Sequence, residues 1–320
     1  MPNPAILSSM LTAGLKATFF RTYDVEYKAE LALLADVMDT DLPSDTLTEE
    51  YGYMEAAPHP RYVPDGQPTP KESFGSVGFT CTNRKFELSI PWRKFDRLFA
   101  KDDVLRRAKM GGTNFAQLDE RILTQYLTAA ADPLLMPSVP NAPDGSALFA
   151  TSRFGIAAGN IYTGTGTSVT QLTSDLINAV AQAGQYQDGK GQPLLSSRMI
   201  DAGVIIMYPL GMAENMTKML RQITIDGGAN AGVSNVIRDA QFKITPWPTS
   251  RLTGSDWFLF FKGAPVKAFF SQKATPGLET HIWTADNSQA AQESGEECIN
   301  FELVKGVGIQ LPVGVMQVNN

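Results

Sequence analysis

The chain of 320 residues has few of the side chains that build disulfides, zinc sites and catalytic bases. Its two cysteines, Cys81 and Cys298, do not make a disulfide framework, so a reducing compartment is expected. Its two histidines, His59 and His281, show no His-Glu-x-x-His or Cys/His zinc spacing. No serine stands in a Gly-x-Ser-x-Gly elbow, so a histidine-dependent hydrolase is only an alternative and no enzyme activity is expected.

Long apolar runs and basic runs are also missing. No window of about eighteen apolar residues predicts a membrane span. The N-terminus lacks a basic region followed by an apolar core, so no signal peptide is expected. The formal net charge is −6, which does not favour tight binding to a phosphate backbone. The 43% hydrophobic content is enough for one sizeable core or two.

Three segments come close to ligand-binding motifs and fail. Segment 184–191 resembles a phosphate-binding P-loop, but Gly191 stands where Ser or Thr should hold magnesium, so we expect a surface loop. Segment 164–166 lacks the third glycine of a dinucleotide fingerprint and predicts a turn. Segment 39–45 resembles the start of a calcium loop, but Pro43 occupies a ligand position, so a solvated loop is expected. We therefore predict no metal site and no cofactor.

The most informative stretch runs from Arg84 to Ala131. Between residues 85 and 92, apolar and polar residues alternate, which predicts a strand with one buried face. From Asp102 to Ala131, apolar or small residues recur every three to four positions and predict a long helix, which Gly111-Gly112 could bend or interrupt. The predicted buried positions of this helix are Val104, Ala108, Phe115, Leu118, Ile122 and Tyr126.

Residues 51–83 form a different kind of segment, which contains five prolines and several aromatic residues. Prolines and glycines predict extended backbone with little core of its own. Because a disordered linker would have fewer aromatics, we interpret the segment as an arm that contacts another subunit. The predicted intersubunit residues of the arm and of the strand that follows it are Tyr51, Tyr53, Tyr62, Phe74, Phe79 and Trp92.

The rest of the chain mixes helices and strands, which predicts an α+β fold. A first helix is expected over residues 4–20, an ambiguous apolar stretch over 29–38 and a polar, turn-rich segment over 39–50. Ser168 to Gln171 has the capping-box pattern of a helix start, and a second helix is expected through Met212 and Met219. Strands are expected near residues 204–208, 241–245, 257–261, 266–271, 299–304 and 307–311.

The order and spacing of several short motifs resemble one known family. They are Glu50-Tyr51-Gly52-Tyr53-Met54, Lys85-Phe86-Glu87-Leu88-Ser89-Ile90, Trp257-Phe258-Leu259-Phe260 and Phe301-Glu302-Leu303. Together they resemble the major head (capsid) subunit of Mu-like tailed bacteriophages and prophages. The resemblance implies the tailed-phage major capsid fold of Hong Kong 97 type. It implies an N-terminal arm at 1–50, an extended loop at 51–95, a peripheral domain with a spine helix at 96–140, an axial domain at 141–250 and peripheral strands at 251–320.

The resemblance also implies a function and partners. A subunit of this kind assembles with itself through pentamers and hexamers into an icosahedral head around double-stranded DNA, which it contacts weakly and without sequence specificity. Expected partners are a separate scaffold protein, a maturation protease and a portal, with a decoration protein as a further option. The expected location is the virion, assembled in the host bacterial cytoplasm. An encapsulin-like shell around a cargo enzyme is the alternative of the same fold.

Overall fold

The computed structural model describes residues 4–54, 76–93, 96, 101–221, 243–284 and 287–320, and the chain divides into two compact units. Unit 1 comprises residues 1–49, 81–123 and 271–307. Unit 2 comprises residues 50–80, 124–270 and 308–320. Each unit therefore gathers segments that lie far apart in the sequence.

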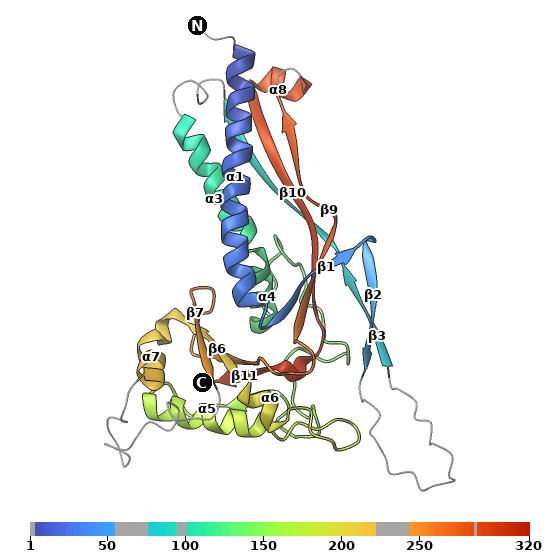
Figure 1. Ribbon diagram of the computed structural model, residues 1–320, viewed down its shortest axis with the longest axis vertical. Coiled ribbons are helices and arrows are strands. Elements are labelled where there is room, and N and C mark those ends of the chain that lie inside the picture. Colours follow the sequence, from blue (N-terminus) through green and yellow to red (C-terminus); the bar gives the residue numbers. More distant parts are fainter. Residues whose placement is uncertain (1–3, 55–75, 94–95, 97–100, 222–242, 285–286) are drawn as a thin grey trace. The chain divides into compact units, whose positions relative to one another are not determined.

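Unit 1 contains most of a four-stranded sheet with the order β1-β9-β10-β4 (Figure 1). Its strands are β1 (Met38–Ser44), β9 (Phe269–Trp283), β10 (Glu296–Ile309) and β4 (Arg84–Arg93). β10 and β4 are antiparallel, with Phe301 opposite Leu88 and Ile299 opposite Ile90. The predicted strand after residue 84 is thus confirmed, whereas residues 299–311, expected as two strands, belong mainly to the single strand β10. A short helix, α8 (Gln289–Ser294), lies between β9 and β10.

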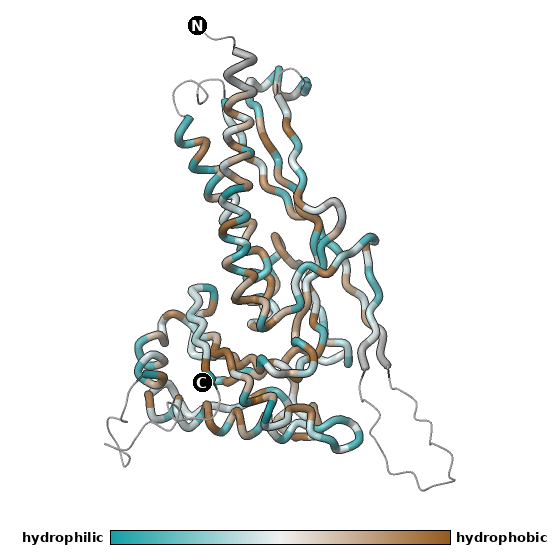
Figure 2. Tube along the Cα trace, in the orientation of Figure 1, coloured by the Kyte–Doolittle hydropathy of each residue, from teal (hydrophilic) through white to brown (hydrophobic). Residues whose placement is uncertain are grey.

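Helix α1 (Pro4–Leu34) is longer than the helix predicted over residues 4–20. Buried aromatic and aliphatic residues recur every fourth position along it, which keeps one stripe facing the rest of unit 1. The stripe consists of Leu11, Leu15, Phe19, Tyr23 and Tyr27. In Figure 2, hydrophobic and hydrophilic residues alternate along α1, as expected for a helix with one buried stripe. The ambiguous stretch from residue 29 is helical because it continues this helix through Leu34.

The predicted long helix consists of α3 (Lys101–Ala116) and α4 (Leu118–Thr128), with the interruption at Gln117 and not at the glycines. A backbone hydrogen bond from Gln117 N to Thr113 O and another from Arg121 N to Gln117 O span the junction. Gly112 has another role: a Cβ there would lie 2.8 Å from the backbone oxygen of Phe19. The glycines of α3 therefore let α1 approach closely (Figure 1).

Residues 39–50, expected to be a polar, turn-rich loop, contribute to two strands. They contribute to β1 and to β2 (Thr48–Met54), which pairs with β3 (Ser76–Thr82) in a separate two-stranded sheet. The reason is that β1 adds to the edge of the larger sheet beside β9, where tertiary pairing outweighs local turn preference.

Unit 2 contains a five-stranded mixed sheet with the order β5-β11-β8-β6-β7. Its strands are β5 (Ile161–Thr163), β11 (Val315–Asn319), β8 (Trp257–Phe261), β6 (Val204–Pro209) and β7 (Ile244–Thr249). β6 is buried at all its positions, as its continuous apolar run predicts. β8 and β11 lie in this sheet, so residues 251–320 do not all belong with the sheet of unit 1, in contrast to the division expected from the sequence.

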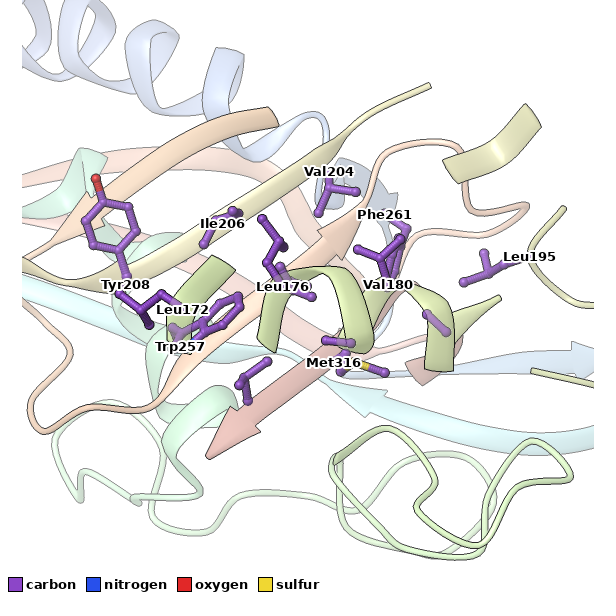
Figure 3. Close-up of a cluster of buried hydrophobic side chains, with 14 of the residues drawn as sticks. Leu172, Leu176, Val180, Leu195, Val204, Ile206, Tyr208, Trp257, Phe261 and Met316 are labelled. Carbon is purple, nitrogen blue, oxygen red and sulfur yellow. The ribbon is translucent and has the colours of Figure 1, made fainter. Parts of the chain in front are cut away.

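Three helices accompany this sheet: α5 (Val169–Ala183), α6 (Ser197–Asp201) and α7 (Ala213–Arg221). Short 3-10 turns at Leu210–Met212 and Pro312–Gly314 precede α7 and β11. Ser168 caps α5 in the predicted capping box with Gln171. Figure 3 shows Leu172, Leu176 and Val180 of α5 packed against residues of β6, β8 and β11 in one apolar cluster.

Candidate assembly elements and a buried charge cluster

The base of the β2–β3 hairpin is covered by its own chain. The rings of Tyr51 and Phe79 lie 5.6 Å apart, and both pack against Phe270, with centroids at 4.8 and 5.9 Å. Tyr51 and Phe79 are each half-buried. The side chain of Tyr53 and the predicted arm residues Tyr62 and Phe74 lie outside the part of the chain that the structure describes. The base of the hairpin thus packs on Phe270 of its own chain, without a second subunit.

Trp92 is placed differently from the intersubunit role predicted for it. Its side chain is 1% exposed at the end of β4, and its Nε1 donates a hydrogen bond of 2.9 Å to Glu297 Oε2. A ring that its own unit covers is not available to a neighbour in this conformation. The alternating pattern of β4 therefore indicates, at Trp92, a side chain in the core of its own subunit and not an intersubunit contact.

The predicted core positions of the long helix are all buried, with 8% exposure or less. They are Val104, Ala108, Phe115, Leu118, Ile122 and Tyr126. The ring of Phe115 contacts that of Phe19 in α1 edge-on at 5.7 Å, and Phe19 stacks on Phe301 of β10. Helix α1 thus packs against both α3 and the sheet, and α3 itself reaches β4, since a Cβ on Gly111 would lie 3.7 Å from Ile90 Cδ1.

Unit 1 also buries a cluster of charged and polar side chains around Lys305 of β10. Lys305 Nζ donates to Asp119 Oδ2 at 2.6 Å, to Asp41 Oδ1 at 3.0 Å and to Tyr27 Oη at 2.9 Å. The Tyr27 hydroxyl donates to Asp41 Oδ1 at 2.7 Å. Lys305 is 2% exposed and Asp119 1% exposed. Four elements, α1, β1, α4 and β10, each contribute one member.

The motif analysis missed this cluster, although β10 carries a signal for it. Lys305 is in phase with Phe301 and Leu303 on the inward face of the strand, and all three are buried. A lysine on an apolar strand face needs an anionic partner, because an isolated buried charge is costly. The sequence pattern does not identify that partner as Asp119 or Asp41. The aspartate segment 39–45, interpreted as a solvated loop, contributes Asp41 here.

Burial and charge act in opposite directions on these groups. Burial favours the neutral form of Asp41, but Lys305 and the Tyr27 hydroxyl outweigh it and lower the Asp41 pKa below its ordinary value. The pKa of Asp119 is raised by burial, which Lys305 offsets only in part. Burial favours the neutral amine of Lys305, but Asp119 and Asp41 raise its pKa overall. Burial thus acts most strongly on Asp119, whereas Lys305 and Asp41 are each favoured in their charged forms by their neighbours.

The other candidate sites show no ligand-binding geometry among the described residues. No group of three or more His, Cys, Asp or Glu side chains in the described ranges is arranged to hold a metal ion. In segment 184–191, Asp188 Oδ1 accepts from the backbone N–H of Lys190 and of Gln192, which closes a surface turn. His281 is exposed beside Glu279 and Glu302, at 3.7 and 3.6 Å, and His59 lies outside the described residues.

No family model and no curated protein matches the sequence. Solved structures do match. The capsid of an empty GTA particle superposes with a TM-score of 0.56 at 8% identity, covering 89% of this chain and 88% of that one. The mature capsid of bacteriophage PhiM1 gives 0.52 at 13% identity, covering 88% and 85%. A virus-like particle from Pyrococcus furiosus gives 0.51 at 8% identity, covering 93% and 96%.

The chain has the tailed-phage capsid fold. The similarity extends over nearly the whole length of both chains, so it includes both units and not a single common motif. The expected α+β fold class of Hong Kong 97 type is confirmed. Among the described residues, no helix combines the length and low polarity that crossing a bilayer requires.

Proposed function

We propose that this protein is the major capsid subunit of a tailed bacteriophage or prophage of the Mu-like kind. It assembles through hexamers and pentamers into an icosahedral head that encloses double-stranded DNA. The observation that supports this most is the capsid fold over almost the full chain. The acidic net charge suits a container whose wall contacts DNA only weakly.

We assign the domains expected from the sequence to the two units of the structure. Unit 1, with α1, α3 and the long strands, serves as the arm and peripheral domain with its spine helix. Unit 2 contains the axial domain, residues 141–250, together with β8 and β11. The β2–β3 hairpin is the base of the extended loop. Head-to-tail contacts between identical subunits close into rings, which is the geometry that a shell needs.

A separate scaffold protein, a maturation protease and a portal are the proposed partners in assembly, with the virion as the final location. Assembly takes place in the host bacterial cytoplasm, in this proposal. An external decoration protein would be an addition to the finished shell. None of these partners adds a cofactor to the subunit.

Electron microscopy of the purified full chain, alone and coexpressed with the proteins encoded beside it, tests the proposal. Rings, tubes or closed shells of uniform curvature are expected. A monodisperse monomer at all concentrations and salt conditions, by analytical ultracentrifugation, would contradict shell formation. Particles that contain an enzyme in place of DNA would favour the encapsulin-like alternative.

Exposed apolar residues on α1 offer a more local test. Val25 is 64% exposed and Met10 62% exposed, on a helix whose opposite stripe is buried. We expect Val25→Glu to reduce the yield of shells or rings while the melting temperature of the monomer stays within a few degrees of the parent. Ala13→Glu, at an exposed small residue of the same helix, is the matched control for added charge. Equal assembly of both variants and the parent would remove this part of α1 from the proposed interface.

A further inference from the structure

The cluster around Lys305 combines a buried primary amine with the buried carboxyl group of Asp119 and with that of Asp41, whose side chain is 30% exposed. Lys305 Nζ lies 2.6 Å from Asp119 Oδ2, and both side chains are 2% exposed or less. The other oxygen of Asp119, Oδ1, is buried and has no hydrogen-bond partner among the residues that the structure describes. An ordinary buried ion pair would satisfy both oxygens of the carboxylate, since an unpaired one is costly.

We propose that Lys305 and Asp119 join in an intramolecular amide (isopeptide) bond, with Asp41 as the group that accepts and returns protons. The bond would join Lys305 Nζ to Asp119 Cγ and link β10 to α4 within one subunit. This inference goes beyond shell formation, because it concerns the folded monomer and does not depend on any neighbour.

The reaction balances without any external reagent. Lys305 begins as an ammonium, Asp119 as a carboxylic acid and Asp41 as a carboxylate. One ammonium proton passes to Asp41, whose Oδ1 lies 3.0 Å from Nζ. The neutral amine attacks Asp119 Cγ from above the carboxyl plane, and the C–N bond forms. Oδ2 then leaves as water with its own proton and a second proton from the nitrogen. The third proton of the original ammonium group stays on the amide nitrogen. Asp41 ends as a neutral carboxylic acid.

Each neighbour has a role in this sequence. Tyr27 accepts from Lys305 Nζ at 2.9 Å and donates to Asp41 Oδ1 at 2.7 Å, so its hydroxyl holds both reacting partners of the proton transfer. The ring of Tyr23 stacks on that of Tyr27 at 5.1 Å, which keeps this side of the cluster apolar. Burial opposes the charged amine, but Asp119 and Asp41 raise the pKa of Lys305 overall, so the neutral amine is the minor form that amide formation consumes. The raised pKa of Asp119 agrees with its starting form as an acid.

The measurement that decides is the intact mass of the folded, purified full chain after denaturation. The expected mass is that of the sequence less one water molecule. Protease digestion should give a branched peptide that joins the segment around Asp119 to the segment around Lys305. A full sequence mass would overturn the proposal. A water deficit confined to one linear peptide, as in a succinimide, would overturn it as well.

Three variants and one control sharpen the result. Asp119→Asn keeps the shape of the acceptor and should lose ammonia in place of water. Asp41→Asn should fold, as circular dichroism would show, and retain the full mass. Lys305→Arg should also retain the full mass, whereas Lys85→Arg, at an exposed lysine of β4, should keep the water deficit. A deficit that persists in Lys305→Arg would exclude Lys305 as the nucleophile.

Discussion

The two units are built on different kinds of core. The cluster at the centre of unit 2 is apolar, with α5 packed on a sheet whose strand β6 is buried throughout (Figure 3). Unit 1 has its aromatic stripe along α1, a close approach of α1 to α3 that requires Gly112, and a buried lysine held by two aspartates. Unit 2 therefore combines buried area with polar pairings between residues close in the sequence, such as Arg153 with Asp144. Unit 1 depends in addition on pairings between distant residues, since Lys305 and Asp119 are 186 positions apart.

This difference predicts how each unit responds to substitution. Apolar cores tolerate changes that conserve volume, whereas a buried charge or a tight helix contact fails when one partner changes. Hydrogen exchange read by mass spectrometry reports on each unit separately, because protection is measured segment by segment. The predictions below use that measurement with chemical unfolding, and run from the largest expected effect to the smallest.

Lys305→Met should destabilise unit 1 most, by about 3–5 kcal/mol, because it removes the partner, hydrogen-bonded or joined in the proposed amide, that the Asp119 and Asp41 side chains share. Lys85→Met, at an exposed lysine paired with Glu87 and Glu302, is the matched control and should leave the unfolding midpoint nearly unchanged. The double variant Lys305→Met/Asp119→Leu should recover part of the loss in urea unfolding. Equal effects of the two lysine substitutions would show that the cluster adds no special stability.

Truncation of core residues should cost a similar amount in either unit but loosen different segments. Phe115→Ala and Ile122→Ala in unit 1, and Leu176→Ala in unit 2, should each cost about 2–5 kcal/mol. Met110→Ala, at an exposed position of α3, is the control and should stay within about 0.5 kcal/mol. Losses below about 1 kcal/mol at both Phe115 and Ile122, which is near the surface range, would mean that the buried face of the long helix is misassigned.

Gly112→Ala should destabilise unit 1, because the new Cβ would meet the backbone of α1. The clash should cost about 1–3 kcal/mol, and the higher helix propensity of alanine should offset part of that cost. Gly14→Ala is the matched control within the same pair of helices. Its Cβ would lie 3.7 Å from Leu105 Cδ2, an ordinary contact, so a gain of about 0.4–1 kcal/mol is expected. Thermal unfolding of the two variants should shift in opposite directions. A shift to higher stability for both variants would show that α1 and α3 can accommodate a methyl group at either position.

Ser168→Ala should have the smallest effect, a loss of about 0.5–2 kcal/mol confined to the start of α5. The hydroxyl of Ser168 accepts from the N–H of Gln171 at the helix start, and alanine removes that acceptor. Ser168→Asp, which keeps an acceptor, should retain most of the protection against hydrogen exchange at residues 169–172. Unchanged exchange in the alanine variant would show that the cap contributes nothing measurable.

The sequence predicts the elements whose pattern is local. The alternation in β4, the capping box of α5 and the apolar run of β6 each contain their own signal, and the structure has all three. β11 and the second half of α1 were not predicted, because their structure depends on the partners they pack against. The same limit applies to Trp92, whose apolar character alone does not distinguish an intersubunit contact from the core of its own unit.

The candidate site shows the same limit more sharply. Lys305 can be recognised as inward-facing from its phase with Phe301 and Leu303, but its partners come from residues 41 and 119. Their proximity depends on the register of α4 and β1 against β10, which no short pattern specifies. The glycines of α3 are a related case. Their presence suggested a bend in the helix, whereas in the structure they allow close packing against α1.

The division of the chain has a consequence for protein synthesis. The backbone passes from one unit to the other five times, after residues 49, 80, 123, 270 and 307. Helix α1 is translated well before Phe301, on which its residue Phe19 stacks. Each core therefore stays incomplete until several separated segments have all been translated, although domains of contiguous sequence commonly fold during synthesis. The apolar stripe of α1 thus stays without its final cover while the segments between α1 and β10 are made, which leaves it open to unproductive contacts during that interval.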